Sequence, residues 1–302
     1  MTEIIEFESF TEEVRKAMEL KYPDNKVEIK RVTKNNGVIY TGVCIKDENE
    51  LIYPTMYLEP FYEEMGGELT DAAVEKMCRV YESRRIGEPL SLNYLKDYEE
   101  IRKGLRCKLI NYDSNREFLE NVPHRLFMDL AIVPYYAFKK DDITALINGD
   151  ATFVVRISHL EMWNREADTV LEDAISNTFR EEEASIVGIY EMLKKLNPAF
   201  SLTPDKEAEC PMYIMSTKGP NGAVSMMYKD KISEFCDSMN CDVYIIPSSI
   251  NEVILVPADN NMEPSMINDM IREINRTQLD AVEVLSDHVY YFERSTGYKE
   301  AV

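Results

Sequence analysis

The residues best placed to do chemistry in this sequence lie in one short polar segment between two apolar runs. That segment puts two hydroxyls, an amide and a carboxylate on one turn, through Ser248, Ser249, Asn251 and Glu252. Such groups could hold a polar ligand or act on a substrate, but serine and asparagine also satisfy the backbone of turns routinely. The residue types favour a structural turn, with a ligand or partner contact as the alternative.

A histidine close to the single tryptophan is the second candidate. His159 lies four residues before Trp163 and could stack on the indole. It could instead lie in a cleft with Glu161 and act as a general base. We expect the packed contact, and the catalytic base is the alternative.

An aromatic group in the run YPTMYLEPFYEEM is the third candidate. Strand alternation would place Tyr53 and Tyr57 on the same face of a strand. They would then either line a groove or cover the edge of the core, and packing is the favoured interpretation.

The common catalytic and metal-binding motifs are absent from the sequence. There is no phosphate-binding glycine loop, no dinucleotide fingerprint and no H-E-x-x-H, and the spacing of Cys236 and Cys241 is not that of a zinc site. Ser286, Asp287 and His288 have the residue types of a catalytic triad, but adjacent residues cannot supply its geometry, so they predict a cap or turn. We therefore predict no catalytic residue, no metal ion and no cofactor.

The elements that must position these groups predict an α+β fold of mainly antiparallel sheets with helices packed on one face. The N-terminal part predicts a helix over 9–22, a hairpin over 26–47, an edge strand over 51–59, helices over 70–84 and 92–103, and strands over 105–112 and 130–138. A helix begins near Asp168, and a second one spans 186–196 after the acidic run 181–183. Beyond it the order is β-β-α-β-β-α-β, with strands at 212–218, 223–229, 242–249, 252–258 and 288–294 and helices at 230–239 and 266–274.

The segment 197–211 contains three prolines and no periodicity, which predicts a linker. This divides the chain into an N-terminal α+β region, 1–196, and a C-terminal α+β region, 208–302. The alternative is one continuous structural unit.

The overall charge limits the partners. Among 302 residues, 34 Lys and Arg against 55 Asp and Glu give a net charge of −21. That balance argues against direct nucleic-acid binding and against an anionic membrane surface, and it favours a protein partner. The sequence shows no secretory signal and no apolar run near the ~20 residues of a membrane span, so we expect a soluble cytoplasmic protein. The oligomeric state is left open.

Several segments together carry a resemblance to a known family: YPTMYLEPFYEE, VPHRLFMDLAIV, ISHLEMWN with SNT at 176–178, GAVSMMYKD, DVYIIPSSINEVILVPAD and VLSDHVYYFERSTG. They resemble a domain-of-unknown-function family of cytoplasmic proteins from low-GC Gram-positive bacteria, frequent in gut Clostridia and often found on mobile elements. The resemblance covers nearly the whole chain, and it implies no activity. Members often have His where this chain has Asn251, which counts against a general base in that turn.

Three functional hypotheses follow. The first is a non-catalytic interaction or regulatory module, favoured because no catalytic set is recognisable. The second is an acidic mimic of nucleic acid that inhibits a DNA- or RNA-binding protein. The third is an enzyme of unrecognised type that uses the 248–252 turn.

Overall fold

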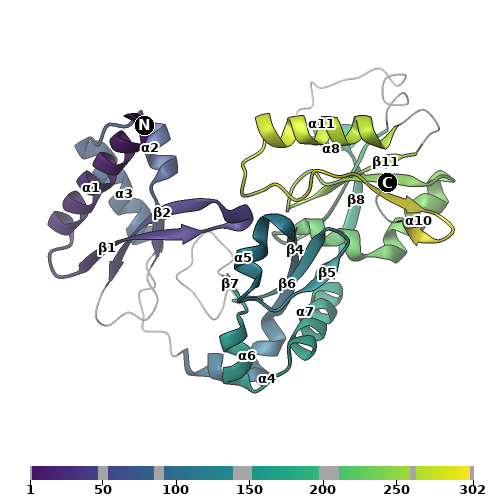
Figure 1. The fold of residues 1–302 in the computed structure, drawn as a ribbon, viewed down its shortest axis with the longest axis horizontal. Coiled ribbons are helices and arrows are strands. Elements are labelled where there is room, and N and C mark those ends of the chain that lie inside the picture. Colours follow the sequence, from purple (N-terminus) through teal and green to yellow (C-terminus); the bar gives the residue numbers. More distant parts are fainter. Residues whose placement is uncertain are drawn as a thin grey trace. The chain divides into compact units, whose positions relative to one another are not determined.

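A computed structural model describes residues 2–46, 54–84, 92–138, 152–196, 211–258 and 263–299 (Figure 1). The chain forms two units, the first made of Met1–Asp97 with Ala137–Thr152 and the second of Tyr98–Tyr136 with Phe153–Val302. The described strands form three sheets whose described pairs are antiparallel, and helices pack on them. The predicted α+β class is confirmed. The predicted division at 197–207 concerns a segment that lies outside the described residues, so that division remains a prediction.

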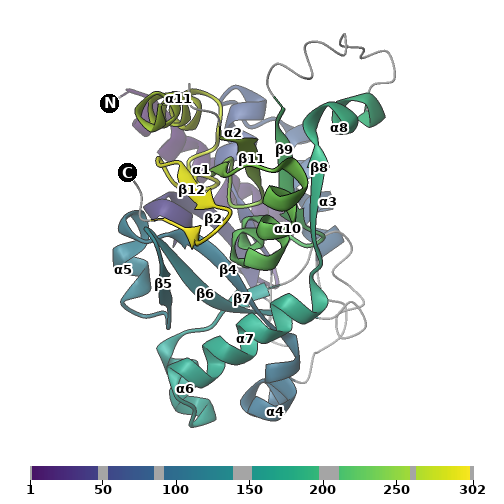
Figure 2. The same ribbon diagram turned by 90° about the vertical axis from the view of Figure 1, so that its right-hand side faces the viewer.

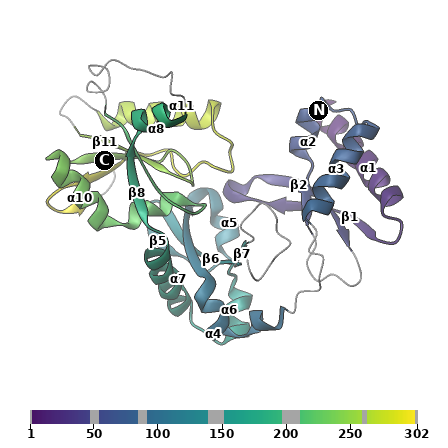
Figure 3. The same ribbon diagram turned by 180° about the vertical axis from the view of Figure 1, so that it is seen from behind.

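The first unit is a three-stranded sheet covered by helices on one face (Figure 3). Its elements are α1 Thr2–Lys21, β1 Lys26–Thr33, the 3-10 helix η1 Asn35–Gly37, β2 Ile39–Lys46, β3 Thr55–Tyr57, α2 Glu59–Met65, α3 Asp71–Arg84 and the 3-10 helix η2 Leu92–Lys96. Phe10, Val14 and Met18 recur at i, i+4 and i+8 on α1 and pack with Val43 and Ile45 of β2. This helical periodicity places the core between α1 and the sheet.

Most sequence predictions for the first unit are confirmed. The 26–47 hairpin forms around Asn36, which has a positive φ of 58°, and β3 lies at the sheet edge, as predicted for the strand over 51–59. The hydroxyl of Thr70 accepts a hydrogen bond from the N–H of Ala73 at 3.2 Å and so caps α3. Leu20, near the end of α1, is exposed.

The second unit begins with a four-stranded sheet. Its elements are α4 Tyr98–Ile101, the 3-10 helix η3 Arg102–Gly104, β4 Leu105–Asn111, the 3-10 helix η4 Asp113–Asn115, α5 Arg116–Leu119, β5 Arg125–Phe127, β6 Leu130–Ala137, β7 Thr152–Val154, α6 Ile157–Trp163 and α7 Ala167–Glu181. The strand β6 is almost wholly buried and pairs with β4, β5 and β7, while α7 lies along β4 and β6 (Figure 2). The predicted helix over 92–103 is instead η2, α4 and η3 in succession.

A six-stranded sheet completes the second unit. It follows the order β13-β12-β10-β11-β9-β8, with β8 Ala184–Gly188, α8 Ile189–Leu196, β9 Tyr213–Thr217, the 3-10 helix η5 Gly222–Met227, α10 Lys229–Met239, β10 Val243–Ile246, β11 Val253–Pro257, α11 Pro264–Thr277, β12 Tyr290–Glu293 and β13 Gly297–Tyr298. On one face, Tyr244 and Val256 pack against Ile267 and Ile271 of α11. On the other face, Tyr213 contacts Phe235 of α10. Helices therefore lie on both faces of this sheet, not on one as predicted (Figure 1).

Two local predictions in the second unit are wrong. Residues 222–227 form the 3-10 helix η5 rather than a strand, because β9 already pairs with β8 on one side and β11 on the other. Residues 186–188 belong to β8 and not to a helix, since β-branched Ile186 and Val187 pair with β9. The acidic run 181–183 consequently ends α7 instead of starting a helix.

Candidate functional site

The polar turn between β10 and β11 uses its own groups to hold its shape. Ser249 is buried, its Oγ accepts the N–H of Asn251 at 3.0 Å, and its own N–H donates to the carbonyl of Glu252 at 3.1 Å. Ser248 and Glu252 lie half-buried on either side of it. The turn thus satisfies its backbone in the way the favoured interpretation expected.

Asn251 connects this turn to the segment that precedes η5. Its Oδ1 accepts the N–H of Asn221 at 3.3 Å, and its carbonyl accepts the hydroxyl of Ser216 at 2.8 Å. The approach at Gly222 is so close that an added Cβ would lie 2.0 Å from Ser216 Oγ and 2.3 Å from the Asn251 carbonyl oxygen. The amide of Asn251 therefore joins two parts of the fold, which leaves it less able to hold a ligand.

His159 and Trp163 form the predicted packed contact. Their ring centroids are 5.4 Å apart, and Nδ1 of His159 accepts the N–H of Arg156 at 3.0 Å at the start of α6. Burial, together with the nearby Arg156 guanidinium, lowers the pKa of His159. The imidazole is thus a neutral, packed helix cap at neutral pH.

Tyr57 lies on β3, and Tyr53 lies outside the described residues. The Tyr57 ring is 5.5 Å from Tyr40 between centroids and has the Nζ of Lys34 at 4.0 Å from its centre. The sequence-predicted sites accordingly lie on three separate elements: the β10–β11 turn, α6 and β3.

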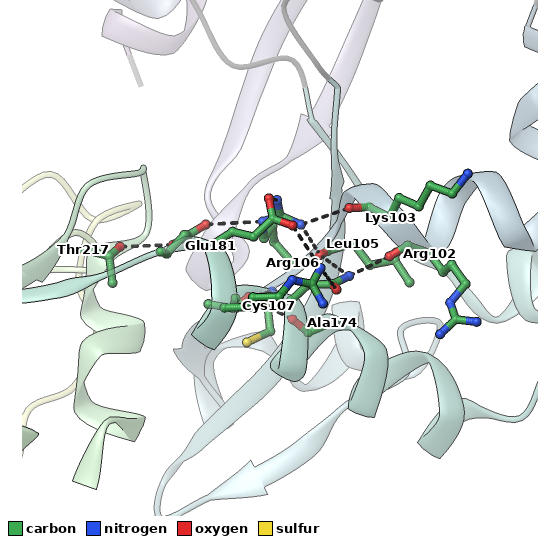
Figure 4. Close-up of polar contacts among 12 residues, drawn as sticks. Arg102, Lys103, Leu105, Arg106, Cys107, Ala174, Glu181 and Thr217 are labelled. Atoms are coloured by element: carbon green, nitrogen blue, oxygen red, sulfur yellow. Dashed lines mark hydrogen bonds and ion pairs between the residues drawn. The ribbon is translucent and has the colours of Figure 1, made fainter. Parts of the chain in front are cut away.

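A polar cluster that the sequence did not reveal joins the end of α7 to β4 (Figure 4). Arg106 of β4 donates to the carbonyl of Leu105 at 2.7 Å and to Glu181 at 2.6 Å, and its Nε lies 3.9 Å from Glu182. The hydroxyl of Thr217 on β9 donates to Glu182 at 3.1 Å. The carboxylates at the C-terminal end of α7, where the helix dipole disfavours them, are thus offset by Arg106.

The same helix is fixed to β4 by side chains that cap backbone groups. Thr178 accepts the N–H of Cys107 at 2.9 Å and donates to the carbonyl of Ala174 at 2.9 Å, while the amide of Asn177 donates to the carbonyls of Arg102 and Leu105 (Figure 4). Burial raises the pKa of the Cys107 thiol to about 12. A protonated, buried thiol is a poor nucleophile, so this cluster is a structural junction and not a catalytic centre.

A second cluster, which we call the Asp129 cluster, joins the β5–β6 turn to the start of β12 and the segment before it. The carboxylate of Asp129 accepts the hydroxyls of Ser286 at 2.6 Å and Tyr290 at 2.7 Å, and His288 Nδ1 lies 3.5 Å from it. Burial, and the carboxylate of Asp129, raise the pKa of Tyr290 well above its usual value. Sequence analysis did not single out Asp129, which directly precedes the strand predicted over 130–138.

This geometry differs from a catalytic triad in one decisive respect. The hydroxyl of Ser286 donates to the Asp129 carboxylate and accepts the backbone N–H of His288 at 3.1 Å. The serine hydroxyl and the His288 imidazole thus both approach the same Asp129 oxygen, instead of each other as in a triad. The predicted turn role of Ser286 is therefore confirmed. In the structure, Met128 and Asp129 form the two-residue turn between β5 and β6, and Met128 has a positive φ of 57°. The sequence carries no turn signature at these two residues.

Within the described ranges, no three His, Cys, Asp or Glu residues gather in a way that could hold a metal ion. Across the same part of the chain, no helix combines the length and apolar character needed to cross a membrane. The prediction that the protein needs no cofactor remains a prediction.

Comparison with known proteins adds a family and no activity. Neither the curated proteins nor the solved structures gave a match. The model of one family matches residues 7–294, nearly the whole chain, in agreement with the resemblance seen in the sequence. The chain therefore belongs to the Family of unknown function (DUF5688).

Proposed function

We propose that the protein is a non-catalytic interaction module that binds a protein partner through the surface of α11. The observation that carries this proposal is a stripe of three exposed apolar side chains, Met266, Met270 and Ile274, which are 70%, 47% and 45% exposed. Their i, i+4, i+8 spacing places them on one side of the helix. Contiguous exposed apolar surface of this kind marks an interaction site more often than chance.

The contacts of α11 define which side carries the stripe. Ile267 and Ile271 face the six-stranded sheet, and Asn268 and Asn275 hydrogen-bond to the segment 286–289. The helical spacing places the stripe on the side of the helix away from these asparagines. Two isoleucines of that sheet, Ile246 and Ile254, are half-buried and pack against the same apolar cluster as Ile267 and Ile271.

The chemistry of the stripe and of the polar clusters agrees with a binding role. Methionine side chains are flexible and polarizable, and they adapt to partner surfaces. The hydroxyl of Ser249 and the carboxylate of Asp129 are engaged in internal hydrogen bonds. These side chains therefore support a scaffold more readily than a reaction.

The cellular location of the protein and the type of organism it comes from are also part of the proposal. The described cysteines Cys44, Cys78, Cys107, Cys236 and Cys241 are free thiols, which supports a reducing, cytoplasmic environment. An origin in low-GC Gram-positive bacteria and on mobile elements rests on the sequence resemblance.

The test is an affinity pull-down of the full-length tagged protein from lysate of its native host, analysed by mass spectrometry. We expect a stoichiometric protein partner that is retained by the wild type, lost with Met270→Lys, and retained with Leu20→Lys, a control at an exposed apolar position of the first unit. Equal capture by all three proteins would contradict the assigned surface.

Either of two other results would favour a different function. Turnover of a substrate that disappears when Ser248, Ser249 and Glu252 are truncated would establish an enzyme. Capture of a nucleic-acid enzyme that salt releases, with no effect of Met270→Lys, would favour nucleic-acid mimicry.

A further inference from the structure

Four lysines share one face of the sheet in the first unit. Val27 and Ile29 of β1 face the helices. Because side chains alternate along a strand, the even-numbered residues of β1 and their cross-strand partners face the other way. That opposite face carries Lys26, Lys30 and Lys46, together with Lys34, whose Nζ lies over the Tyr57 ring. We call it the lysine face.

Folding alone does not favour this arrangement. Lys26 and Lys46 are directly opposite each other across β1 and β2, and like charges in that position destabilise a sheet. Glu28 lies among them, with its carboxylate 2.9 Å from Lys26, 2.6 Å from Lys46 and 3.8 Å from Lys30. Hydrogen bonds from Lys46 and Lys26 lower the pKa of Glu28 to about 2.

Among the described residues of the lysine face, lysines outnumber carboxylates, in a protein of net charge −21. Glu28 is the only carboxylate among the described β1, β2 and β3 residues that point to this side. The side chains of Lys26, Lys30 and Lys46 are 75%, 43% and 30% exposed, so a ligand can reach their ammonium groups. An anion could replace the carboxylate of Glu28 in its contacts with these lysines.

Aromatic side chains accompany the lysines. Tyr40 and Tyr57 pack 5.5 Å apart on the same face, and Gly42 separates Lys30 from Tyr57 in one cross-strand row. The Thr55 side chain fills the space above Gly42, since its Cγ2 lies 2.4 Å from where a Cβ on Gly42 would be. Lysines that follow a backbone, next to tyrosines on which bases can stack, are the components of single-strand recognition.

The length of the row indicates a linear ligand. Lys26, Lys30 and Lys34 recur every four residues, and an extended strand advances ~3.3 Å per residue, so the row spans roughly 27 Å. A single phosphate group could contact only one end of it. We infer that the lysine face binds single-stranded nucleic acid, with the lysines on phosphates and Tyr57 stacked on a base.

The net charge of the whole chain argues against nucleic-acid binding, but it does not determine whether the lysine face can bind a nucleic acid. Screening over about 8 Å at physiological salt weakens the effect of distant carboxylates on a ligand that contacts the lysines directly. Charge averaged over 302 residues cannot show that four lysines lie together. The inference is independent of the α11 surface.

Fluorescence anisotropy of the full-length protein with a labelled oligothymidylate of about 12 nucleotides tests the inference. We expect saturable binding at low salt, at least about tenfold weaker for the double variant Lys26→Gln and Lys30→Gln, with the slope of log affinity against log salt smaller by about 1.4. Tyr57→Ala should weaken binding about tenfold. Glu28→Gln should strengthen it severalfold, a gain that misfolding cannot produce.

Lys16→Gln is the matched control, because Lys16 is an exposed lysine of α1 away from the sheet. Its affinity should stay within twofold of the wild type. The inference is overturned if the wild type shows no saturable binding, if the control weakens binding as much as the double variant, or if Glu28→Gln has no effect. Competition by polyglutamate as effective as that by unlabelled oligonucleotide would also overturn it, since the ligand would then be any linear polyanion.

Discussion

Replacing Asp129 with alanine tests whether the Asp129 cluster holds the second unit together. The carboxylate accepts two short hydrogen bonds, at 2.6 Å from Ser286 and at 2.7 Å from Tyr290. Both donors are 1% exposed, so neither hydroxyl gains water as a replacement when Asp129 is removed.

The magnitude follows from these two bonds. Hydrogen bonds to a charged group contribute about 1.5–3 kcal/mol each. The Asp129 side chain is 33% exposed, which places each bond near the lower end of that range because water competes for the carboxylate. We therefore expect Asp129→Ala to lower the free energy of unfolding of the second unit by about 3 kcal/mol.

Urea unfolding followed by tryptophan fluorescence measures this change in the correct unit. Trp163 is the only tryptophan and belongs to the second unit, so its emission reports the unfolding of that unit. Asp287→Ala is the matched control: Asp287 is exposed and accepts one bond, at 2.8 Å from Asn275, and its loss should cost less than about 1 kcal/mol. A loss for Asp129→Ala no larger than that of the control would refute the reasoning.

Two further predictions concern buried groups. The thiol of Cys107 has a pKa of about 12 in the folded protein and about 9 in the unfolded protein. Its contribution to stability is therefore complete below about pH 9 and is lost as the pH rises toward 12. Thermal melts at increasing pH should show a smaller loss of stability for Cys107→Ala than for the wild type. Gly222→Ala should destabilise the protein by about 3 kcal/mol, since the added Cβ would overlap Ser216 and Asn251. The control Gly66→Ala should cost only about 1 kcal/mol, because Gly66 has a φ of +63° but an added Cβ would meet no atom within 4 Å. Equal losses of stability in circular dichroism melts would disprove the steric argument.

Local signals in the sequence were sufficient for several elements. The hairpin predicted over 26–47 and the helix predicted over 70–84 both form, as β1–β2 and α3, because turn and cap chemistry depends on a few adjacent residues. The apolar runs on either side of the 248–252 turn predicted β10 and β11. The contact between His159 and Trp163 was also predictable, since both lie on the same helix, α6.

Predictions failed where a distant partner determined the local structure. The segment 223–229 has an apolar pattern typical of a strand, but both edges of β9 are occupied and the segment forms η5. An acidic run such as 181–183 is typical of a helix start, but here it ends α7. Arg106 and Thr217 donate hydrogen bonds to its carboxylates and so stabilise them at this end of the helix. In both cases tertiary contacts outweighed local propensity.

The sequence by itself determined the α+β class, the main strands and helices, and the absence of a familiar catalytic motif, because periodicity and turn chemistry act over a few residues. Only the tertiary structure decided that Asp129 meets Ser286 and Tyr290, more than 150 residues away along the chain. It also decided that four lysines share one sheet face and that Met266, Met270 and Ile274 stay exposed. These features depend on which faces of strands and helices are covered, and packing between distant segments determines that.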